Sequence, residues 1–325
     1  METIAAVVVT FNRKHLLRDC LDALLGQTYP IHSIIVIDNA SSDGTSRFLQ
    51  ENNYLQNPLI DYIRLDENTG GAGGFAHGVK TGYEKGFDWL WLMDDDALPM
   101  KDALLKLAPY FGMTDVAALA SRVQGASGEI QTTHRGRIFY KKYFEFLQTP
   151  VPEQCYNSGF VDIDMASFVG LLIKTDVIPG VGFPREDFFL HHDDVDYSIR
   201  LRSRGRMLLI PESVIVHRDE HSKPENMRRR FGRASPRIAQ SSIWLSYFSP
   251  RNLVYLGKRH CASPWRFYVQ LLMFVWRKTA GILIYDNHKK ARLACFLRGI
   301  ADGLRGDFRN QYPFQLRMRG KTHGL

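Results

Sequence analysis

The chain has 325 residues, of which 45% are hydrophobic and 23% charged, a composition typical of globular proteins with one large or two smaller domains. Its four cysteines are widely spaced and form no CxxC pair, which argues against a zinc knuckle or a disulfide framework and favours a reducing compartment. The N-terminal stretch lacks the basic segment and cleavage site of a signal peptide, so we expect a cytoplasmic protein.

The net charge of +8 is unevenly distributed along the chain. Residues 221–325 contain 21 Lys and Arg against 4 Asp and Glu, a net charge of +17, whereas residues 1–220 have a net charge of −9. We therefore predict a first domain over residues 1–225 and a basic, mainly helical region over residues 226–325. A basic surface can bind nucleic acid, anionic lipid or a phosphorylated substrate, and charge alone does not select among them.

Strands and helices alternate along the first part, which predicts an α/β domain with a mostly parallel sheet flanked by helices. Continuous runs of β-branched and other apolar residues are typical of buried parallel strands. Leucines at helical spacing follow the first strand, and Asn12 can cap that helix. The expected strands are Ile4–Thr10, Ser33–Asp38, Ile60–Leu65, Phe87–Met93, Val116–Ser121, Met207–Ile210 and Val214–His217; later helices are expected over Phe75–Lys85 and Asp193–Arg204.

Polar signatures follow four of these strands directly. They are Thr10 with Asn12, then Asp38, then the glycine-rich stretch 68–74, and finally the acids 94–96. Ligands of open α/β sheets bind outside the carboxyl ends of the strands. We therefore expect these four strand ends to line one crevice.

Two acidic clusters are the strongest candidates for chemistry. Residues 94–96 are three aspartates at the end of a buried strand, where like charges are costly unless a cation such as Mg²⁺ or Mn²⁺ compensates them. Asp193 and Asp194 begin a helix, so that one can cap it while its neighbour faces the crevice as a general base. Solvated helix caps are the alternative for both clusters. His217, at a strand end, can complete a metal shell or be structural.

The motifs VVVTFNR, IIVIDNASSDGT, WLMDDD and HDDVDYSIRLRSRG, with the glycine stretch between them, occur in the order seen in family 2 glycosyltransferases, which have the GT-A fold. The chain resembles this family over about residues 4–220, and within it the motifs are similar to those of bacterial galactofuranosyltransferases. The resemblance implies an inverting transferase that uses a nucleotide-sugar donor, here UDP-galactofuranose, and Mn²⁺ or Mg²⁺. A rhamnosyltransferase that uses dTDP-rhamnose is the alternative within the family.

The resemblance also implies roles for individual residues. Asp194 takes the place of the catalytic base, and Asp193 stands where the family usually has a glutamate. The metal or the sugar nucleotide is held by Asp94 and Asp96, and His217 is a further metal ligand. The remaining residues implied in donor binding are Thr10, Asn12, Asp38 and Asp95.

The glycine-rich stretch NTGGAGG fits the dinucleotide fingerprint loosely, but it follows the third expected strand rather than the first. A tight turn with positive φ accounts for one or two of its glycines, not for four. We predict a backbone surface in close approach to the donor sugar and diphosphate. It consists of Asn68, Gly70, Gly71, Gly73 and Gly74.

The basic region contains no motif for chemistry. Its aromatic-rich segment Trp265–Tyr285 has an uninterrupted apolar core, Phe267–Trp276, which is too short to span a membrane. One interpretation is helices that pack on the first domain. The other is a surface that rests on the anionic inner face of the cytoplasmic membrane, as would suit an enzyme that extends a lipid-linked glycan acceptor.

Two classes compete with an enzyme. Nucleic-acid binding lacks a recognition motif and leaves the acidic crevice unexplained, so we expect no nucleic-acid partner. A sugar-binding module without activity is disfavoured because both acid clusters are intact.

Overall fold

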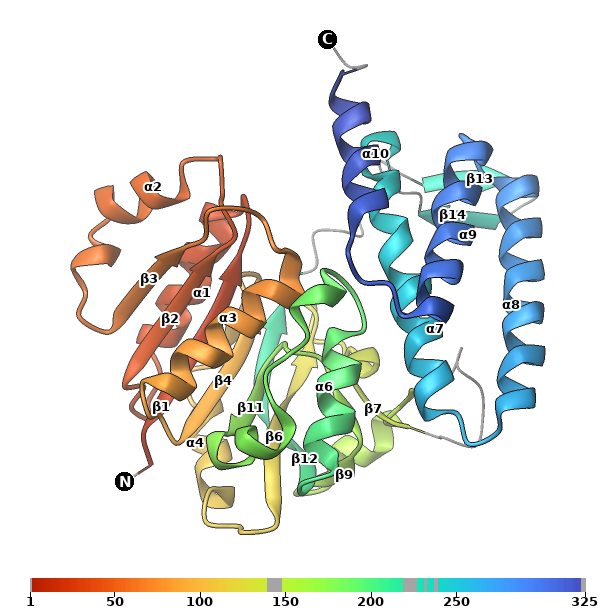
Figure 1. The fold of residues 1–325 in the computed structure, drawn as a ribbon. Helices are drawn as coiled ribbons and strands as arrows, with labels where there is room; N and C mark the ends of the chain where they lie inside the picture. The colour runs from red at the N-terminus through yellow and green to blue at the C-terminus, as the bar shows by residue number, and fades with distance from the viewer. Residues whose placement is uncertain (1, 139–147, 219–226, 231–232, 237–238, 323–325) are drawn as a thin grey trace. The chain divides into compact units, whose positions relative to one another are not determined.

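The computed structural model describes residues 2–138, 148–218, 227–230, 233–236 and 239–322, which form two compact units (Figure 1). The first unit contains the described residues up to 138 together with 148–189 and 193–218. The second contains 190–192 and the described residues after 226. The predicted boundary between residues 225 and 226 lies outside the described residues, so the predicted domain limits stay a prediction.

The first unit is built on a nine-stranded mixed sheet in which the long strands run parallel, as expected. The strands are β1 (Ile4–Thr10), β2 (Ser33–Asp38), β3 (Ile60–Arg64), β4 (Trp89–Asp94), β5 (Ala97–Pro99), β6 (Val116–Gln124), β9 (Val161–Ile163), β11 (Leu171–Lys174) and β12 (Arg206–His217). Their order is β3-β2-β1-β4-β11-β6-β12-β5, and β9 also pairs with β12. β11 runs antiparallel to β4 and β6, and β5 and β9 run antiparallel to β12.

Helices cover both faces of this sheet, which is why its central strands are apolar throughout. On one face Leu17 and Leu21 pack into the core, and on the other Phe75 and Val79 do so. The helices are α1 (Lys14–Leu25), α2 (Thr45–Glu51), α3 (Gly70–Glu84), α4 (Ala103–Leu107), α5 (Ile178–Val181) and α6 (Asp193–Arg202). A small second sheet joins β7 (Arg135–Arg137), β8 (Thr149–Pro150) and β10 (Met165–Ala166) in the order β10-β7-β8.

Three local expectations were wrong. The two short strands expected near residue 210 are one strand, β12, whose pairing with β6 shifts register between Ile210 and Val214, at the Pro-Glu-Ser interruption. α3 begins at Gly70 rather than Phe75, so the glycines lie inside the helix. Asn12 does not cap α1, because its side-chain oxygen accepts a hydrogen bond from the Ser42 backbone N–H at 2.7 Å.

The second unit is mainly helical, as expected. It contains α7 (Phe248–His260), α8 (Pro264–Tyr285), α9 (Lys289–Arg305) and α10 (Gln311–Thr322), with a hairpin of β13 (Met227–Arg230) and β14 (Arg233–Pro236). α8 lies beside α9 (Figure 1). α8 continues through Arg277 and Lys278. By length and apolar composition alone, its 22 residues suffice to cross a membrane. The expectation that this segment is too short to span a membrane was therefore wrong.

Candidate active site

The strand register brings three of the four predicted strand-end signatures together, those of Thr10, Asp38 and Asp94. Thr10 of β1 is the register partner of Asp38 of β2, and Val9 is the partner of Asp94 of β4. Because β1 lies between β2 and β4 and all three are parallel, their carboxyl ends meet at one edge of the sheet. The predicted convergence of these residues follows from the sheet order.

A hydrogen-bonded cluster forms around the acids that end β4. Asp95 accepts one hydrogen bond from the Thr10 hydroxyl at 2.7 Å and another from Arg13 Nη1 at 3.1 Å. The same Arg13 nitrogen donates to Asp96 Oδ2 at 2.7 Å. The sequence interpretation missed Arg13, although it lies in the same TFNR motif as Thr10. It ties two of the three carboxylates to the end of β1.

Burial and mutual repulsion make this cluster hard to ionise. Burial, reinforced by Asp96 and Asp95, raises the pKa of Asp94 to about 7. Burial likewise raises the pKa of Asp95 to about 6, although Arg13 opposes it. Burial acts in the same direction on Asp96, but His217 and Arg13 outweigh it and hold the pKa of Asp96 below its usual value. A cation would therefore relieve an unfavourable concentration of negative charge.

His217, at the end of β12, lies beside this cluster and is hydrogen-bonded on its other side. Its Nε2 lies 3.4 Å from Asp96 Oδ1, and its Nδ1 lies 3.1 Å from Gln131 Oε1. The same Gln131 oxygen lies 3.1 Å from His134 Nε2, and His134 Nδ1 lies 2.8 Å from the Ser167 hydroxyl. No motif in the sequence pointed to Gln131 or His134, because only the folded chain brings them to His217.

The second acid pair begins α6. Asp194 Oδ1 accepts a hydrogen bond from the Val195 N–H at 2.8 Å. Burial raises the pKa of Asp194 to about 6, whereas the Val195 N–H and the Arg135 guanidinium act to lower it. Burial, then Asp194 and then Asp94 keep the pKa of Asp193 well above its usual value. Because the negative charge of Asp94 contributes to the raised pKa of Asp193, the two predicted acid clusters lie within electrostatic reach of each other.

Arg135, which the sequence interpretation also missed, lies completely buried behind this pair. Its guanidinium donates to four backbone carbonyl oxygens, those of Ser121 at 2.8 Å, His134 at 2.8 Å, Val169 at 2.5 Å and Ser167 at 3.4 Å. Burial lowers the pKa of Arg135 to about 10, so it stays charged at neutral pH. Its positive charge favours the ionised form of Asp194.

The backbone just before α6 is strained. Phe189, His191 and His192 have φ of 61°, 69° and 63°, which non-glycine residues seldom adopt. Such strain concentrates at functional sites, where the surrounding fold holds it in place. The Phe189 carbonyl accepts the Ala72 N–H at 3.2 Å. A side chain on Gly70, whose own φ is 76°, would place its Cβ 2.0 Å from that carbonyl oxygen.

Most of the predicted glycine surface packs inside the protein. A Cβ on Gly74 would lie 2.5 Å from Val9, and one on Gly73 would lie 2.4 Å from the Thr69 side chain. The Asn68 side chain accepts the Gly70 N–H at 2.8 Å. Gly71 differs, because it is half-buried and a Cβ there would meet nothing within 4 Å. Of the four predicted glycines, Gly71 is the one with open space beside it.

Asp38 is fully buried and both of its carboxylate oxygens accept hydrogen bonds. One accepts from the Tyr62 hydroxyl, and the other accepts from the Ser41 backbone N–H at 2.8 Å. Asn12 is exposed nearby and donates its backbone N–H to the Ser41 hydroxyl at 2.9 Å. The predicted role of Asp38 in donor binding stays a prediction.

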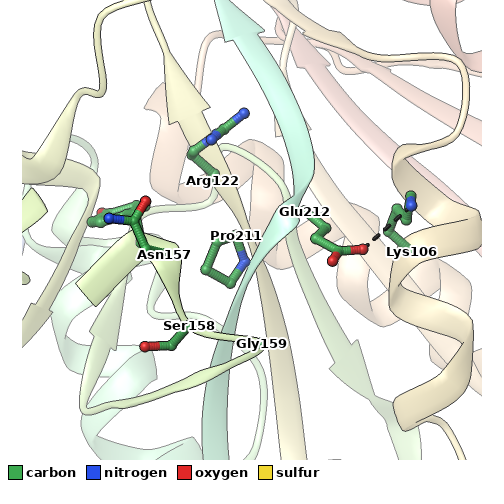
Figure 2. Close-up of a pocket in the computed structure, with 8 residues that line it drawn as sticks. Lys106, Arg122, Asn157, Ser158, Gly159, Pro211 and Glu212 are labelled. Carbon is green, nitrogen blue, oxygen red and sulfur yellow. Dashed lines mark hydrogen bonds and ion pairs between the residues drawn. The ribbon is translucent and has the colours of Figure 1, made fainter. Parts of the chain in front are cut away.

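A separate hollow of about 370 Å³ opens beside the register shift of β12 (Figure 2). Lys106 and Glu212 form an ion pair of 3.3 Å on its lining. Arg122 Nε and the Tyr156 hydroxyl are buried there and have no hydrogen-bond partner among the described residues. Of the described residues that line the hollow, none belongs to the predicted site. It is distinct from the acid clusters.

Comparison with protein families agrees with this geometry. The model of the family "Glycosyl transferase family 2" matches residues 5–167. The chain is 31% identical over 209 residues to the galactofuranosyltransferase GlfT1 of Mycolicibacterium smegmatis. This alignment covers 63% of the chain and 67% of that protein. The chain is 29% identical over 210 residues to GlfT1 of Mycobacterium tuberculosis, covering 63% and 66%. The matched segment thus spans about two thirds of each relative's length.

Solved structures share the fold at low identity. The structure of Staphylococcus aureus TarS 1–349 in complex with UDP-GlcNAc has a TM-score of 0.57 at 13% identity and covers 99% of this chain and 92% of that one. The structure of GalNAc-T7 with UDP, GalNAc and Mn²⁺ has a TM-score of 0.59 at 15% identity and covers 95% and 58%. At these identities the likeness establishes the fold alone.

Proposed function

Because the chain belongs to glycosyl transferase family 2, we propose that it transfers galactofuranose from UDP-galactofuranose to a hydroxyl of a growing, lipid-linked cell-surface polysaccharide. The observation that carries an enzymatic role is the pair of buried acid clusters at the end of β4 and the start of α6; burial, then Asp194 and then Asp94 raise the pKa of Asp193. The choice of donor is supported by the similarity to the two galactofuranosyltransferases.

Asp194 is the proposed general base. With a pKa of about 6 it is ionised at neutral pH, yet basic enough to accept a proton from a hydroxyl as that oxygen forms its bond to the sugar. The acceptor oxygen attacks the anomeric carbon from the face opposite UDP, and the bond between that carbon and the diphosphate breaks. Burial and the neighbouring Asp194 raise the pKa of Asp193 well above its usual value, so the two neighbouring carboxyl groups lie in different electrostatic surroundings.

The residues at the end of β4 fit a divalent metal ion. Asp96 Oδ1 is buried and accepts no hydrogen bond from the described residues, and His217 Nε2 lies 3.4 Å from it. Within the described residues no three His, Cys, Asp or Glu side chains form a complete metal cluster. Such a partial set suits Mg²⁺ or Mn²⁺, which use substrate phosphates as further ligands.

In this proposal Asp94, Asp96 and His217 hold the metal, which when bound would supply positive charge to the departing diphosphate. Arg13 keeps the Asp95 and Asp96 carboxylates together through its two hydrogen bonds. Thr10 fixes Asp95 from the end of β1.

Gln131 orients the imidazole ring of His217. An amide oxygen only accepts hydrogen bonds, so His217 Nδ1 and His134 Nε2 both direct their N–H groups at Gln131 Oε1. The lone pair of a neutral His217 then lies on Nε2, which faces Asp96. That tautomer is the one a metal requires, and an outer hydrogen bond of this kind orients a ligating histidine.

A donor screen tests the proposed function. The full-length protein is assayed with UDP-galactofuranose, UDP-galactopyranose and dTDP-rhamnose, each with a lipid-linked oligosaccharide acceptor and Mn²⁺. We expect transfer from UDP-galactofuranose alone. Transfer from dTDP-rhamnose in its place would overturn the donor assignment, and release of free sugar without any transfer product would overturn the acceptor class.

A further inference from the structure

α8 presents an uncovered apolar face. Eight of its large hydrophobic side chains have exposed fractions between 43% and 72%. Soluble monomers seldom leave so many large apolar side chains uncovered on one element unless it meets a partner or a membrane. They are Trp265, Tyr268, Val269, Leu272, Met273, Trp276, Leu283 and Ile284.

The spacing of these residues places them on one side of the helix. They recur at intervals of three, four and seven residues, which share a helical face. Phe267, Leu271 and Phe274 alternate with them and lie on the opposite side, buried in a hydrophobic cluster with residues of α7 and α9. α8 is therefore held by its neighbours along one side and uncovered along the other (Figure 1).

The charges of α8 have one sign. It carries Arg266, Arg277 and Lys278 and contains no Asp or Glu. Arg266 and Arg277 are about three turns apart and so flank the same edge of the exposed apolar face. A partner that suits this face must offer apolar surface bordered by negative charge. A second copy of the chain would bring the same cations to the contact and no acid from α8 to pair with them.

We propose that the exposed face of α8 binds the surface of an anionic lipid bilayer. The helix lies in the plane of the headgroups, its apolar side chains enter the acyl boundary, and Arg266 and Arg277 meet lipid phosphates. Trp265 and Trp276 suit this depth because indole rings favour the membrane–water interface. A spanning orientation would separate Phe267 and its buried neighbours from α7 and α9, whereas an in-plane orientation keeps those contacts. This inference does not depend on the donor sugar.

Co-sedimentation with vesicles tests the proposal. The full-length protein should bind vesicles that contain phosphatidylglycerol and bind pure phosphatidylcholine vesicles much more weakly. Leu272→Glu puts a charge at a side chain that is 72% exposed and should weaken binding at least tenfold without loss of folding. Leu105→Glu, on α4 in the first unit and 47% exposed, is the matched control and should bind as the wild type does. Equal binding by both variants would overturn the assignment to α8.

Three further experiments distinguish in-plane binding to a membrane from a membrane-spanning helix and from contact with a second copy of the chain. Arg266→Gln should weaken binding about fivefold at low salt, since a basic residue near an anionic surface contributes about that factor. Alkaline carbonate should release the bound protein, and protein that resists extraction would overturn the in-plane orientation. A dimer in sedimentation velocity that Leu272→Glu dissociates, with no vesicle binding by the wild type, would identify a second copy as the occupant and overturn the proposal.

Discussion

At the scale of single residues, the neighbours Asp193 and Asp194 have the same side chain and different surroundings. Burial raises the pKa of Asp194. The hydrogen bond from the Val195 N–H and the charge of the buried Arg135 oppose this rise, so that the pKa is about 6. Burial also raises the pKa of Asp193, and the negative charges of Asp194 and Asp94 raise it further. The fold therefore gives two identical side chains different electrostatic surroundings.

Replacement of Asp194 should stop chemistry without preventing donor binding. Asp194→Asn keeps the size of the side chain but removes the base, so we expect kcat to fall by about 10²–10⁴-fold. UDP affinity, measured by calorimetry, should stay within about twofold. In the wild type, kcat should fall about tenfold per unit as the pH drops below about 6, because the base must be ionised to act.

The matched control for this prediction is Asp176→Asn, an exposed aspartate that pairs with Lys174 and should leave both quantities unchanged. Near-normal kcat in Asp194→Asn would remove Asp194 from the role of base. A flat rate profile between pH 5 and 7, with circular dichroism showing an intact fold, would contradict the assigned pKa.

Gln131 offers a second prediction at this scale. Gln131→Leu removes the acceptor for His217 Nδ1 and His134 Nε2, so the affinity for Mn²⁺ in the presence of UDP should fall by about 10–100-fold. Gln131→Glu keeps an acceptor oxygen and should restore most of that affinity. Electron paramagnetic resonance of free Mn²⁺ measures both. Equal affinity in Gln131→Leu and the wild type would show that the contact does not position His217.

At the scale of elements, glycines of α3 allow close packing against the sheet. Gly74, Gly78 and Gly82 recur at four-residue intervals and so share one helical face. A Cβ at these positions would come within 2.5 Å of Val9, 2.3 Å of Val7 and 2.3 Å of Leu90, all in the sheet. The absence of side chains lets α3 approach β1 and β4 closely. This periodicity is visible in the sequence, but we predicted Gly74 to belong to a backbone surface that approaches the donor.

Two alanine variants of α3 separate packing from binding. Gly78→Ala forces a Cβ against Val7 and should lower the free energy of unfolding by about 1–3 kcal/mol, measured by urea denaturation. Gly71→Ala meets open space and should raise that free energy by about 0.5–1 kcal/mol, because alanine is the better helix former. If Gly71 faces the donor, its variant should also raise the donor KM. An unchanged KM would remove it from the donor site.

At the scale of the whole molecule, charge and apolar surface divide between the two units. The acid clusters belong to the first unit, and the cations of α8 and its exposed apolar face belong to the second. One part of the chain thus carries the proposed chemistry and the other the proposed membrane contact. The expected vesicle binding should therefore survive Asp194→Asn, which leaves α8 unchanged.

The sequence by itself determined the α/β fold, the family, the two acid clusters and the helical character of the basic region. These features depend on local patterns: apolar runs make buried strands, and acids at strand ends and helix starts remain next to those elements wherever they pack. The start of α3 was harder to predict from the sequence, because glycine is typical both of turns and of close helix packing. Only the contact with Val7 and Val9 decides between the two.

The tertiary structure alone decided which side chains meet. Arg13 and the segment that holds Gln131, His134 and Arg135 reach the acid clusters from two distant places in the chain, and no local pattern encodes those distances. The separation of Asp193 from Asp194 in pKa likewise depends on burial and on charges far away in sequence. Packing also uncovered one side of α8, because α7 and α9 cover only the other. Contacts between distant segments exist only once the chain has folded. The sequence therefore identified the acid clusters, and the fold decided which side chains surround each acid.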